Sequence, residues 1–487
     1  MITEEMIIVK GTERAPFPKS RLPKPIFDEA PECIDLYYKA WELAWDHVYE
    51  QEGMPSSPYM DEGFADSVVW IWDTCFMVHF CKYAPDLFPG IESFDNFYAC
   101  LHDGVELPTS IQHPDNPPLF AWTEYEYYKY TGDDKRIRKL LVEEKYLQKH
   151  FEFLERVRSG DKHGASRGCE MYWQKDEFGY QWRGCPSGMD NTPRGLGKPE
   201  EIYWVDALSQ QILSAHYISL LAEVIGEEKI AEEYAEKSID LKSILQMYYW
   251  DSHDGTFYDV YQNDLTHCKV KTPASYWPML ADACTKNQAL RMVQHLNDPK
   301  IFGDAMPWPT VSKDDPTYSE DGAYWRGSSW LPTNYMVSRG LQRYEFFDDA
   351  HEAAVKIVKA MQETYQNVTP HTIWECYKPK CAEPALTQKG ELVREDFCGW
   401  SALGPISMLI EQAIGIHDID AKNKVVKWES RLKTRHGIES LKFGSTVSSM
   451  VIDKKRVSVT SNEPYTLIIN GKSFEINEGS QEFTLNS

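Results

Sequence analysis

Two acidic residues of this 487-residue chain lie in settings that suit acid–base chemistry. Asp190 lies in residues 187–195, SGMDNTPRG, where two glycines and a proline favour a turn. Glu375 lies in residues 373–379, IWECYKP, between an aromatic residue and a proline-containing turn. A turn can direct a carboxyl group into a cavity, so both residues are candidates for catalysis. Taken alone, the Asp190 segment is equally compatible with an aspartate that caps its own backbone. The Glu375 segment is equally compatible with a solvated glutamate.

A third acidic residue stands among tryptophans in residues 70–73, WIWD, where a strongly apolar segment begins. A carboxylate is costly to bury among aromatic rings unless it finds partners. We therefore expect Asp73 to hold sugar hydroxyls while Trp72 stacks on the sugar ring. A helix cap or a buried ion pair is the alternative for Asp73. Aromatic residues make up 13% of the chain, which suits carbohydrate binding, although most of them must be core residues.

The fourth segment, residues 324–330, is YWRGSSW. Trp325 and Trp330 stand on either side of a glycine turn, and we expect them to line two sides of one pocket. Arg326 lies between them and can hold a catalytic carboxylate or a substrate hydroxyl. Because each of the four segments is ambiguous alone, the interpretation depends on their occurring together.

In this order the four segments resemble the signatures of a clan of glycoside hydrolases that contains family 37 trehalases and family 63 α-glucosidases. The likeness is greatest to bacterial proteins similar to mannosylglycerate and glucosylglycerate hydrolases. It covers about residues 33–415 through the patterns W-x-W-D, S-G-x-D-N-x-P-R, Y-W-R-G-x-x-W and W-E-x-Y-x-P. The resemblance implies an (α/α)₆ barrel that hydrolyses a small α-linked glycoside in an exo-acting manner with inversion.

The resemblance also implies roles for individual residues. Asp190 matches the general acid and Glu375 the general base. One position departs from the family pattern, because Pro186 stands where the loop often has Glu, which puts the pocket shape in question. The same matching places the following residues in or beside the sugar-binding pocket: Trp72, Asp73, Gln112, Asn191, Tyr324, Trp325, Arg326 and Trp330.

The residues themselves are consistent with inverting hydrolysis, independently of the resemblance. Inverting hydrolysis needs two carboxyl groups about 6.5–9.5 Å apart, which leaves room for a water molecule. One of them must be protonated at neutral pH, and desolvated aromatic surroundings raise a carboxyl pKa. Asp190 and Glu375 are far apart in sequence, so a closed ring of helices is needed to bring them face to face. We expect no cofactor and no metal, because no His/Cys/Asp cluster has ligand spacing.

Composition restricts the partners. The formal net charge of −24 and the absence of a basic run argue against nucleic acid and anionic membrane surfaces, whereas a small neutral carbohydrate remains an admissible substrate. No apolar run approaches the roughly 20 residues of a membrane span. The 11 cysteines show no C-x-x-C pair, and we interpret them as reduced thiols of a cytoplasmic protein.

Apolar periodicity predicts a mainly helical fold with two concentric layers of helices. We expect an N-terminal arm over residues 1–32, an (α/α)₆-barrel catalytic domain over 33–435 and a small β-strand appendage over 436–487. Long loops rich in Gly, Pro, Trp and Asp interrupt the helices at about 159–200, 297–327 and 366–399, and such loops are usually functional. The expected helices are 33–52, 66–83, 91–103, 119–131, 135–158, 201–224, 228–249, 272–282, 286–296, 328–344, 347–365 and 400–415.

Other functions remain open on the sequence. A sugar epimerase or isomerase uses the same barrel but generally abstracts protons with histidines, and the 14 histidines here are dispersed. A phosphorylase would need a phosphate site that is not evident, and a non-catalytic carbohydrate-binding protein would need neither carboxyl group. A charged aglycone such as glycerate would favour a cation near the pocket mouth, for which the candidates are Arg183, Arg194 and Lys380.

Overall fold

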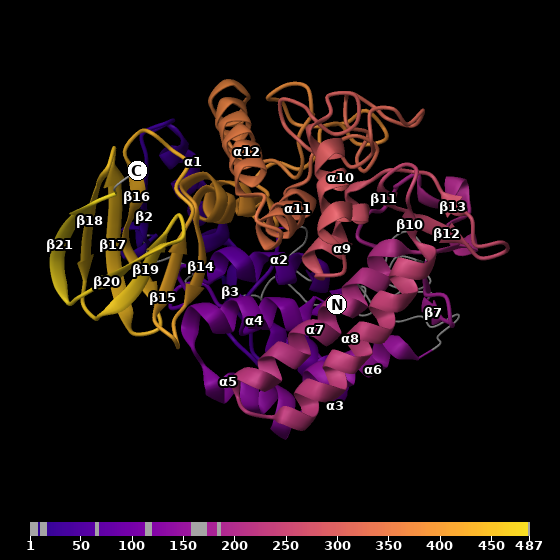
Figure 1. The fold of residues 1–487 in the computed structure, drawn as a ribbon, viewed down its shortest axis with the longest axis horizontal. Helices are drawn as coiled ribbons and strands as arrows, with labels where there is room; N and C mark the ends of the chain where they lie inside the picture. Colours follow the sequence, from indigo (N-terminus) through magenta and orange to yellow (C-terminus); the bar gives the residue numbers. More distant parts are fainter. Residues whose placement is uncertain are drawn as a thin grey trace.

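The structure is a computed structural model that describes residues 8–9, 17–63, 68–112, 119–156, 173–182 and 187–485. It is mostly helical, with a β region at the C-terminal end of the chain, drawn in yellow in Figure 1. The described part contains no helix that is both long enough and apolar enough to cross a membrane.

Inner helices form a closed ring. Each contacts the next around the ring, and the last contacts the first, which confirms the predicted (α/α)₆ barrel. Every residue of the second helix in the chain, α2, is buried, as expected for an inner position. The inner helices are α2 (Ile71–Cys81), α4 (Phe120–Thr131), α7 (Val205–Val224), α9 (Trp277–Leu280), α11 (Leu331–Arg343) and η9 (Gly404–Ile414).

Outer helices pack against this ring with one face and leave the other in solvent. In α8, for example, buried residues recur at three- and four-residue spacing while most of the other positions are exposed or half-buried. The outer helices are α1 (Cys33–Asp46), α3 (Ser93–Asp103), α6 (Tyr146–Glu155), α8 (Glu228–Tyr248), α10 (Lys286–Asn297) and α12 (Phe347–Asn367). Short helical turns complete the set: η2 (Lys19–Arg21), α5 (Asp134–Arg138), η3 (Lys139–Glu143), η5 (Arg194–Gly197), η6 (Pro199–Glu201), η7 (Pro273–Tyr276) and η8 (Ser401–Leu403).

Several predicted helices differ from the observed ones. Those expected over 66–83 and 201–224 begin only at Ile71 and Val205, after short strands, and that expected over 272–282 is divided between η7 and α9. The single helix expected over 135–158 is broken, because Lys145 adopts a left-handed conformation with φ of 58° between η3 and α6. The helix expected over 33–52 ends at Asp46, and the chain continues as strand β3 (Val48–Glu50). Tertiary pairing of β3 with β4 (Tyr59–Met60) thus overrides the helical periodicity there.

The β region consists of two sheets. One has the order β14-β15-β19-β20, with β15 and β19 parallel, and the other is antiparallel with the order β2-β16-β17-β18-β21. Phe443 and Tyr465, one from each sheet, contact each other with ring centroids 5.6 Å apart. The strands are β14 (Ile416–Asp420), β15 (Val425–Trp428), β19 (Tyr465–Ile469), β20 (Lys472–Ile476), β2 (Lys24–Phe27), β16 (His436–Phe443), β17 (Thr446–Asp453), β18 (Arg456–Ser461) and β21 (Gly479–Thr484).

The β structure therefore begins at Ile416, earlier than the change of period that the sequence shows near residue 436. It also takes in β2 from the N-terminal segment, which pairs with β16. The division into residues 1–32, 33–435 and 436–487 stays a prediction. The remaining strands are short: β1 (Ile8–Val9), β5 (Val68–Trp70), β6 (Ser110–Gln112), β7 (Trp173–Lys175), β8 (Tyr180–Trp182), β9 (Ile202–Tyr203), β10 (Trp250–Asp251), β11 (Thr256–Phe257), β12 (Asp259–Tyr261) and β13 (His267–Cys268).

The long loops lie between outer and inner helices. The described parts of 297–327 and 366–399 contain no helix beyond the ends of α10 and α12, as predicted. Residues 159–172 and 183–186 of the predicted loop over 159–200 lie outside the described residues. Loop residues 324–325, 375 and 387–394 line a common pocket with the start of α2.

Candidate active site

A pocket of about 620 Å³ lies at the N-terminal end of α2. Carboxyl groups and aromatic rings together form its wall. Asp190 and Glu375, the two predicted catalytic residues, both belong to this wall. The lining residues are Trp70, Trp72, Asp73, Gly188, Asp190, Asn191, Tyr324, Trp325, Glu375, Thr387, Gln388, Lys389, Glu391, Leu392, Val393, Arg394 and Trp400.

Helix α2 delivers Trp72 and Asp73 to the pocket from its first turn. Both side chains are buried, and neither Trp72 Nε1 nor Asp73 Oδ1 has a hydrogen-bond partner within the described part of the chain. Burial raises the pKa of Asp73 well above its usual range, and the nearby Asp190 and Glu375 add to the shift. An unpaired buried donor and acceptor beside a cavity are suited to bind hydroxyl groups of a ligand.

The loop that carries Asp190 packs closely on Trp72. Gly188 has φ of +75°, and a Cβ atom at this position would lie 2.9 Å from Trp72 Cε2, so glycine alone fits without displacement. Arg194 anchors the far end of the loop: its guanidinium donates to Asp206 at 2.6 and 2.8 Å and to Asp259 at 2.8 and 2.6 Å. These buried contacts fix the turn at both ends of Asp190.

Asn191 joins the Asp190 loop to the predicted aromatic segment. Its side-chain amide donates to the Ala323 carbonyl at 2.9 Å, and its Oδ1 accepts from the Trp325 backbone N–H at 2.7 Å. Arg326 Nε donates to the Asn191 carbonyl at 3.0 Å. Three hydrogen bonds therefore hold the two segments in register, and Asp190 and Tyr324 both reach the pocket.

Glu375 is buried and held by specific hydrogen bonds. The Tyr324 hydroxyl donates to its Oε1 at 3.0 Å, and the Arg394 backbone N–H donates to its Oε2 at 3.3 Å. Its own carbonyl accepts from Trp400 Nε1 at 3.1 Å, which fixes the backbone. Burial raises the pKa of Glu375, while these donors and the Arg394 charge oppose the rise because they stabilise the carboxylate.

Asp190 has different surroundings. Its side chain is open to the pocket, and the described residues provide its carboxyl group with no hydrogen bond. The enclosing protein raises the pKa of Asp190 to about 7, with a smaller contribution from Glu375. Two carboxyl groups whose environments differ in this way can act as a protonated acid and an ionised base at the same pH.

Not all predicted binding residues line the pocket. Trp330 is fully buried behind Trp325, with ring centroids 3.9 Å apart and an angle of 14° between the rings. The expectation that these two tryptophans line opposite sides is therefore wrong: they stack, and Trp330 supports Trp325. Arg326 also lies outside the lining and contacts the Asn191 backbone instead. The Gln112 side chain and Pro186 lie outside the described residues.

Segment 387–394 also lines the pocket, through residues that include Lys389 and Arg394, and no motif in the sequence marks it as part of the site. Its only signal was its place in a long loop. Of the three cations proposed for the pocket mouth, Arg194 is buried in its ion pairs, Lys380 pairs with Glu320, and Arg183 lies outside the described residues.

The prediction that no His/Cys/Asp cluster has ligand spacing is wrong for one group in the described part of the chain: Asp251, His253 and Asp254 at the β10–β11 turn. The Lys269 ammonium lies 3.0 Å from Asp251 and 2.9 Å from Asp254. This cation supplies the positive charge that the two carboxylates need, so the group is explained as an ion-pair cluster. None of these residues lines the pocket.

A helical barrel whose pocket joins carboxyl groups to aromatic rings suits glycoside hydrolysis, and this chain is similar to known glycoside hydrolases. The solved structure of the GH63 mannosylglycerate hydrolase from Thermus thermophilus in complex with Tris superposes with a TM-score of 0.58 at 16% sequence identity, covering 76% of this chain and 99% of that one. The model of the mannosylglycerate hydrolase MGH1-like glycoside hydrolase domain matches residues 102–391. The chain belongs to this family and is a glycoside hydrolase.

Two curated proteins are similar in sequence to this chain. An uncharacterized protein of Borreliella burgdorferi is 26% identical over 479 residues, which cover 93% of this chain and 95% of the relative. The mannosyl-oligosaccharide glucosidase of Saccharomyces cerevisiae is 26% identical over 282 residues, which cover 53% of this chain and 33% of the relative. The match thus extends over about a third of the yeast protein.

Proposed function

We propose that this protein is an inverting, exo-acting glycosidase that cleaves a small α-linked glycoside, an α-glucoside or α-mannoside, with Asp190 as general acid and Glu375 as general base. The observation that carries the proposal is the contrast between the two carboxyl groups in one pocket. Asp190 has a pKa of about 7 and no hydrogen bond from the described residues, whereas two donors stabilise the Glu375 carboxylate.

In the proposed reaction Asp190 donates its proton to the glycosidic oxygen as the bond to the anomeric carbon breaks. Glu375 removes a proton from a water molecule that attacks the same carbon from the opposite face. The carboxylate of Asp190 and the acid form of Glu375 then exchange protons with solvent. Each proton transfer contributes roughly 10²- to 10⁴-fold to the rate.

The other lining residues bind the sugar in this proposal. Asp73 Oδ1 and Trp72 Nε1 meet hydroxyl groups, and the parts of the mostly buried Trp72 and Trp325 rings that line the pocket contact the sugar. The alternative of a sugar epimerase or isomerase finds no support, because the pocket lining in the described residues contains no histidine.

An acidic aglycone such as glycerate is consistent with this pocket. Lys389 and Arg394 place two cationic side chains on the wall that the 387–394 segment forms. The family model and the Thermus structure carry the name mannosylglycerate hydrolase. We also propose that the protein is cytoplasmic, because the cysteines in the described residues are free thiols, which suits a reducing compartment.

Proton NMR of the first product tests the mechanism. We expect an α-glycoside to release the β-anomer before mutarotation. Asp190→Asn should strongly reduce hydrolysis of substrates with poor leaving groups and affect glycosyl fluorides much less, whereas Glu375→Gln should suppress both. Initial release of the α-anomer would require a covalent intermediate and carboxyl groups only about 5–5.5 Å apart, and would refute the role of Glu375 as base.

A further inference from the structure

A second cavity, of about 450 Å³, lies at the far end of α2 from the first pocket. We call it the basal cavity; its wall includes Lys82, Tyr217, Arg339, Arg343, Asp418 and Lys427. Helix α2 places Asp73 in the first pocket and ends just before Lys82, and its 11 residues span about 16 Å. The two cavities are therefore separate sites. Strands β14 and β15 close the basal cavity on the side of the β region.

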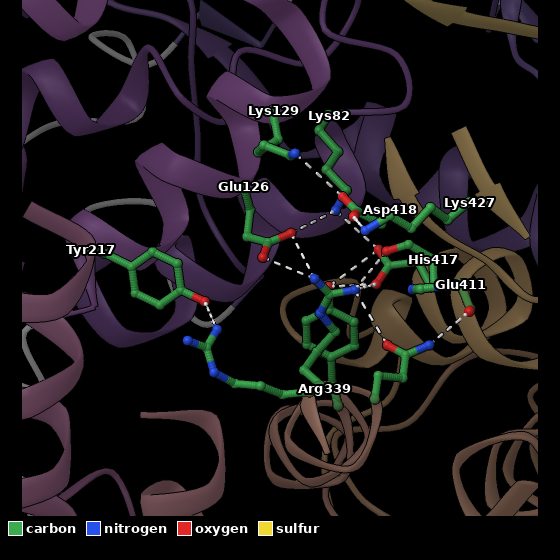
Figure 2. Close-up of polar contacts among 12 residues, drawn as sticks. Lys82, Glu126, Lys129, Tyr217, Arg339, Glu411, His417, Asp418 and Lys427 are labelled. Carbon is green, nitrogen blue, oxygen red and sulfur yellow. Dashed lines mark hydrogen bonds and ion pairs between the residues drawn. The ribbon is translucent and has the colours of Figure 1, made fainter. Parts of the chain in front are cut away.

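Most charges around the basal cavity are paired. Figure 2 shows Arg339 between Glu126 and Glu411: its Nη2 donates to both Glu126 oxygens at 2.9 Å, and its Nη1 donates to Glu411 at 3.2 Å. Lys82 lies 3.0 Å from Glu411, and the fully enclosed Glu411 keeps a lowered pKa because Lys82 and Arg339 outweigh its burial. In these ion pairs the opposite charges balance each other. The pairs link helices of the barrel, and they need no ligand to neutralise them.

Arg343 differs from these paired residues. Its Nη2 contacts His216 Nε2 at 2.7 Å and its Nη1 contacts the Tyr217 hydroxyl at 3.5 Å, so both close partners are uncharged. His216 is neutral at pH 7, because burial and the Arg343 charge lower its pKa to about 4. Within the described residues, the carboxylate within 4 Å of the guanidinium is that of Asp282, at 3.6 Å from Nε.

Asp282 does not balance the positive charge of this corner. Its side chain is half exposed, and Lys242 lies 3.8 Å from the same carboxylate. Burial lowers the pKa of Lys242, and the Arg343 charge lowers it further. Two cations, Arg343 and Lys242, thus share the half-exposed Asp282 carboxylate. The Arg343 side chain itself is only 26% exposed. Arg343 Nε is buried and has no hydrogen-bond partner in the described residues, and the nearest carboxylate, that of Asp282, is half exposed and shared with Lys242, so the guanidinium can accept a further anion.

The rest of the wall limits which anion fits. Glu126, Glu345, Asp418 and Glu429 also line the cavity, so a dianion such as phosphate meets stronger repulsion than a monocarboxylate. Carboxylates accept hydrogen bonds from hydroxyl groups, and rings of Phe347 and His417, with centroids 5.0 Å apart, add apolar surface. A volume of about 450 Å³ is within the usual range for small-molecule sites.

We propose that the basal cavity is a second ligand site that binds a small polyhydroxylated monocarboxylate, a sugar acid, through a charge-assisted hydrogen bond from Arg343. Its hydroxyl groups donate to the wall carboxylates. The site is distinct from the catalytic pocket and does not depend on the proposed hydrolytic mechanism.

Isothermal titration calorimetry of the full chain with gluconate tests this proposal, with glucitol as a neutral ligand of similar size and inorganic phosphate as the dianion. We expect gluconate to bind more tightly than either. Arg343→Gln should weaken gluconate binding at least tenfold, and Arg343→Lys less than that. Arg138→Gln, a change of an arginine outside both cavities, should leave it unaltered.

Hydrolysis by the Arg343 variants serves as the folding control, because Arg343 lies outside the active-site pocket. Lys389→Gln identifies the site of binding: it should leave the gluconate affinity intact. Loss of gluconate binding in Lys389→Gln but not in Arg343→Gln would assign the ligand to the catalytic pocket and overturn the proposal. Equal binding of glucitol and gluconate, tighter binding of phosphate, or no binding of gluconate would also overturn it.

Discussion

Removing the Tyr324 hydroxyl should shift the pH dependence of catalysis in a defined direction. This hydroxyl donates to Glu375 Oε1 at 3.0 Å, and it opposes the effect of burial on the Glu375 pKa. In Tyr324→Phe the carboxylate loses a donor while remaining buried, so its pKa rises. A general base works only when ionised, and the acidic limb of kcat/KM must therefore move to higher pH.

The size of the shift follows from the contact. A hydrogen bond to a charged group contributes about 1.5–3 kcal/mol, and one pKa unit corresponds to about 1.36 kcal/mol. Complete loss would thus raise the pKa by about 1–2 units. Water can enter the pocket and replace part of the bond, and the Arg394 backbone N–H still donates to Oε2 at 3.3 Å. We expect a shift of about 1 unit, which is about a tenfold loss of rate on the acidic limb.

A glycosyl fluoride is the appropriate substrate, because its leaving group needs little protonation and the profile then reports mainly on Glu375. The profile of kcat/KM against pH should be measured for the wild type and Tyr324→Phe. Tyr318→Phe is a matched control, since the Tyr318 hydroxyl has no hydrogen-bond partner in the described part of the chain and lies outside the pocket lining. An unmoved limb, or a shift to lower pH, would refute the assignment of Glu375 as base.

Three further predictions concern two residues that support the Asp190 loop and the dependence of activity on metal ions. Gly188→Ala should reduce kcat/KM at least tenfold with unchanged circular dichroism, because its Cβ would lie 2.9 Å from Trp72; full activity would contradict the close fit. Arg194→Leu should cost about 3–5 kcal/mol of unfolding free energy in denaturant titrations, since Asp206 and Asp259 lose their buried partner. Activity should survive EDTA, and a loss reversed by added zinc or calcium would reveal a metal requirement.

The repeating pattern of apolar residues determined most of the helical architecture. Segment 347–367 carries a buried face at helical spacing, so its type and approximate length were predictable, whereas segment 205–224 is buried on nearly every side. The pattern failed at Lys145, where a left-handed residue breaks a continuous periodicity, and at β14 and β15, whose sheet is completed by the distant β19. Such strands form because they pair with segments that are distant in sequence, so the pattern of neighbouring residues does not reveal them.

The residue types around Asp190 and Glu375 likewise indicated acid–base chemistry from sequence alone. Only the tertiary structure brought the two into one pocket, gave Glu375 its hydrogen bond from Tyr324 and left Asp190 without one from the described residues. It also showed that Trp330 stacks behind Trp325 and that the 387–394 segment forms a wall. The sequence determines which groups can ionise or stack. Burial, charge proximity and hydrogen-bond partners arise when distant segments fold together, and these decide the pKa values and exposure of those groups.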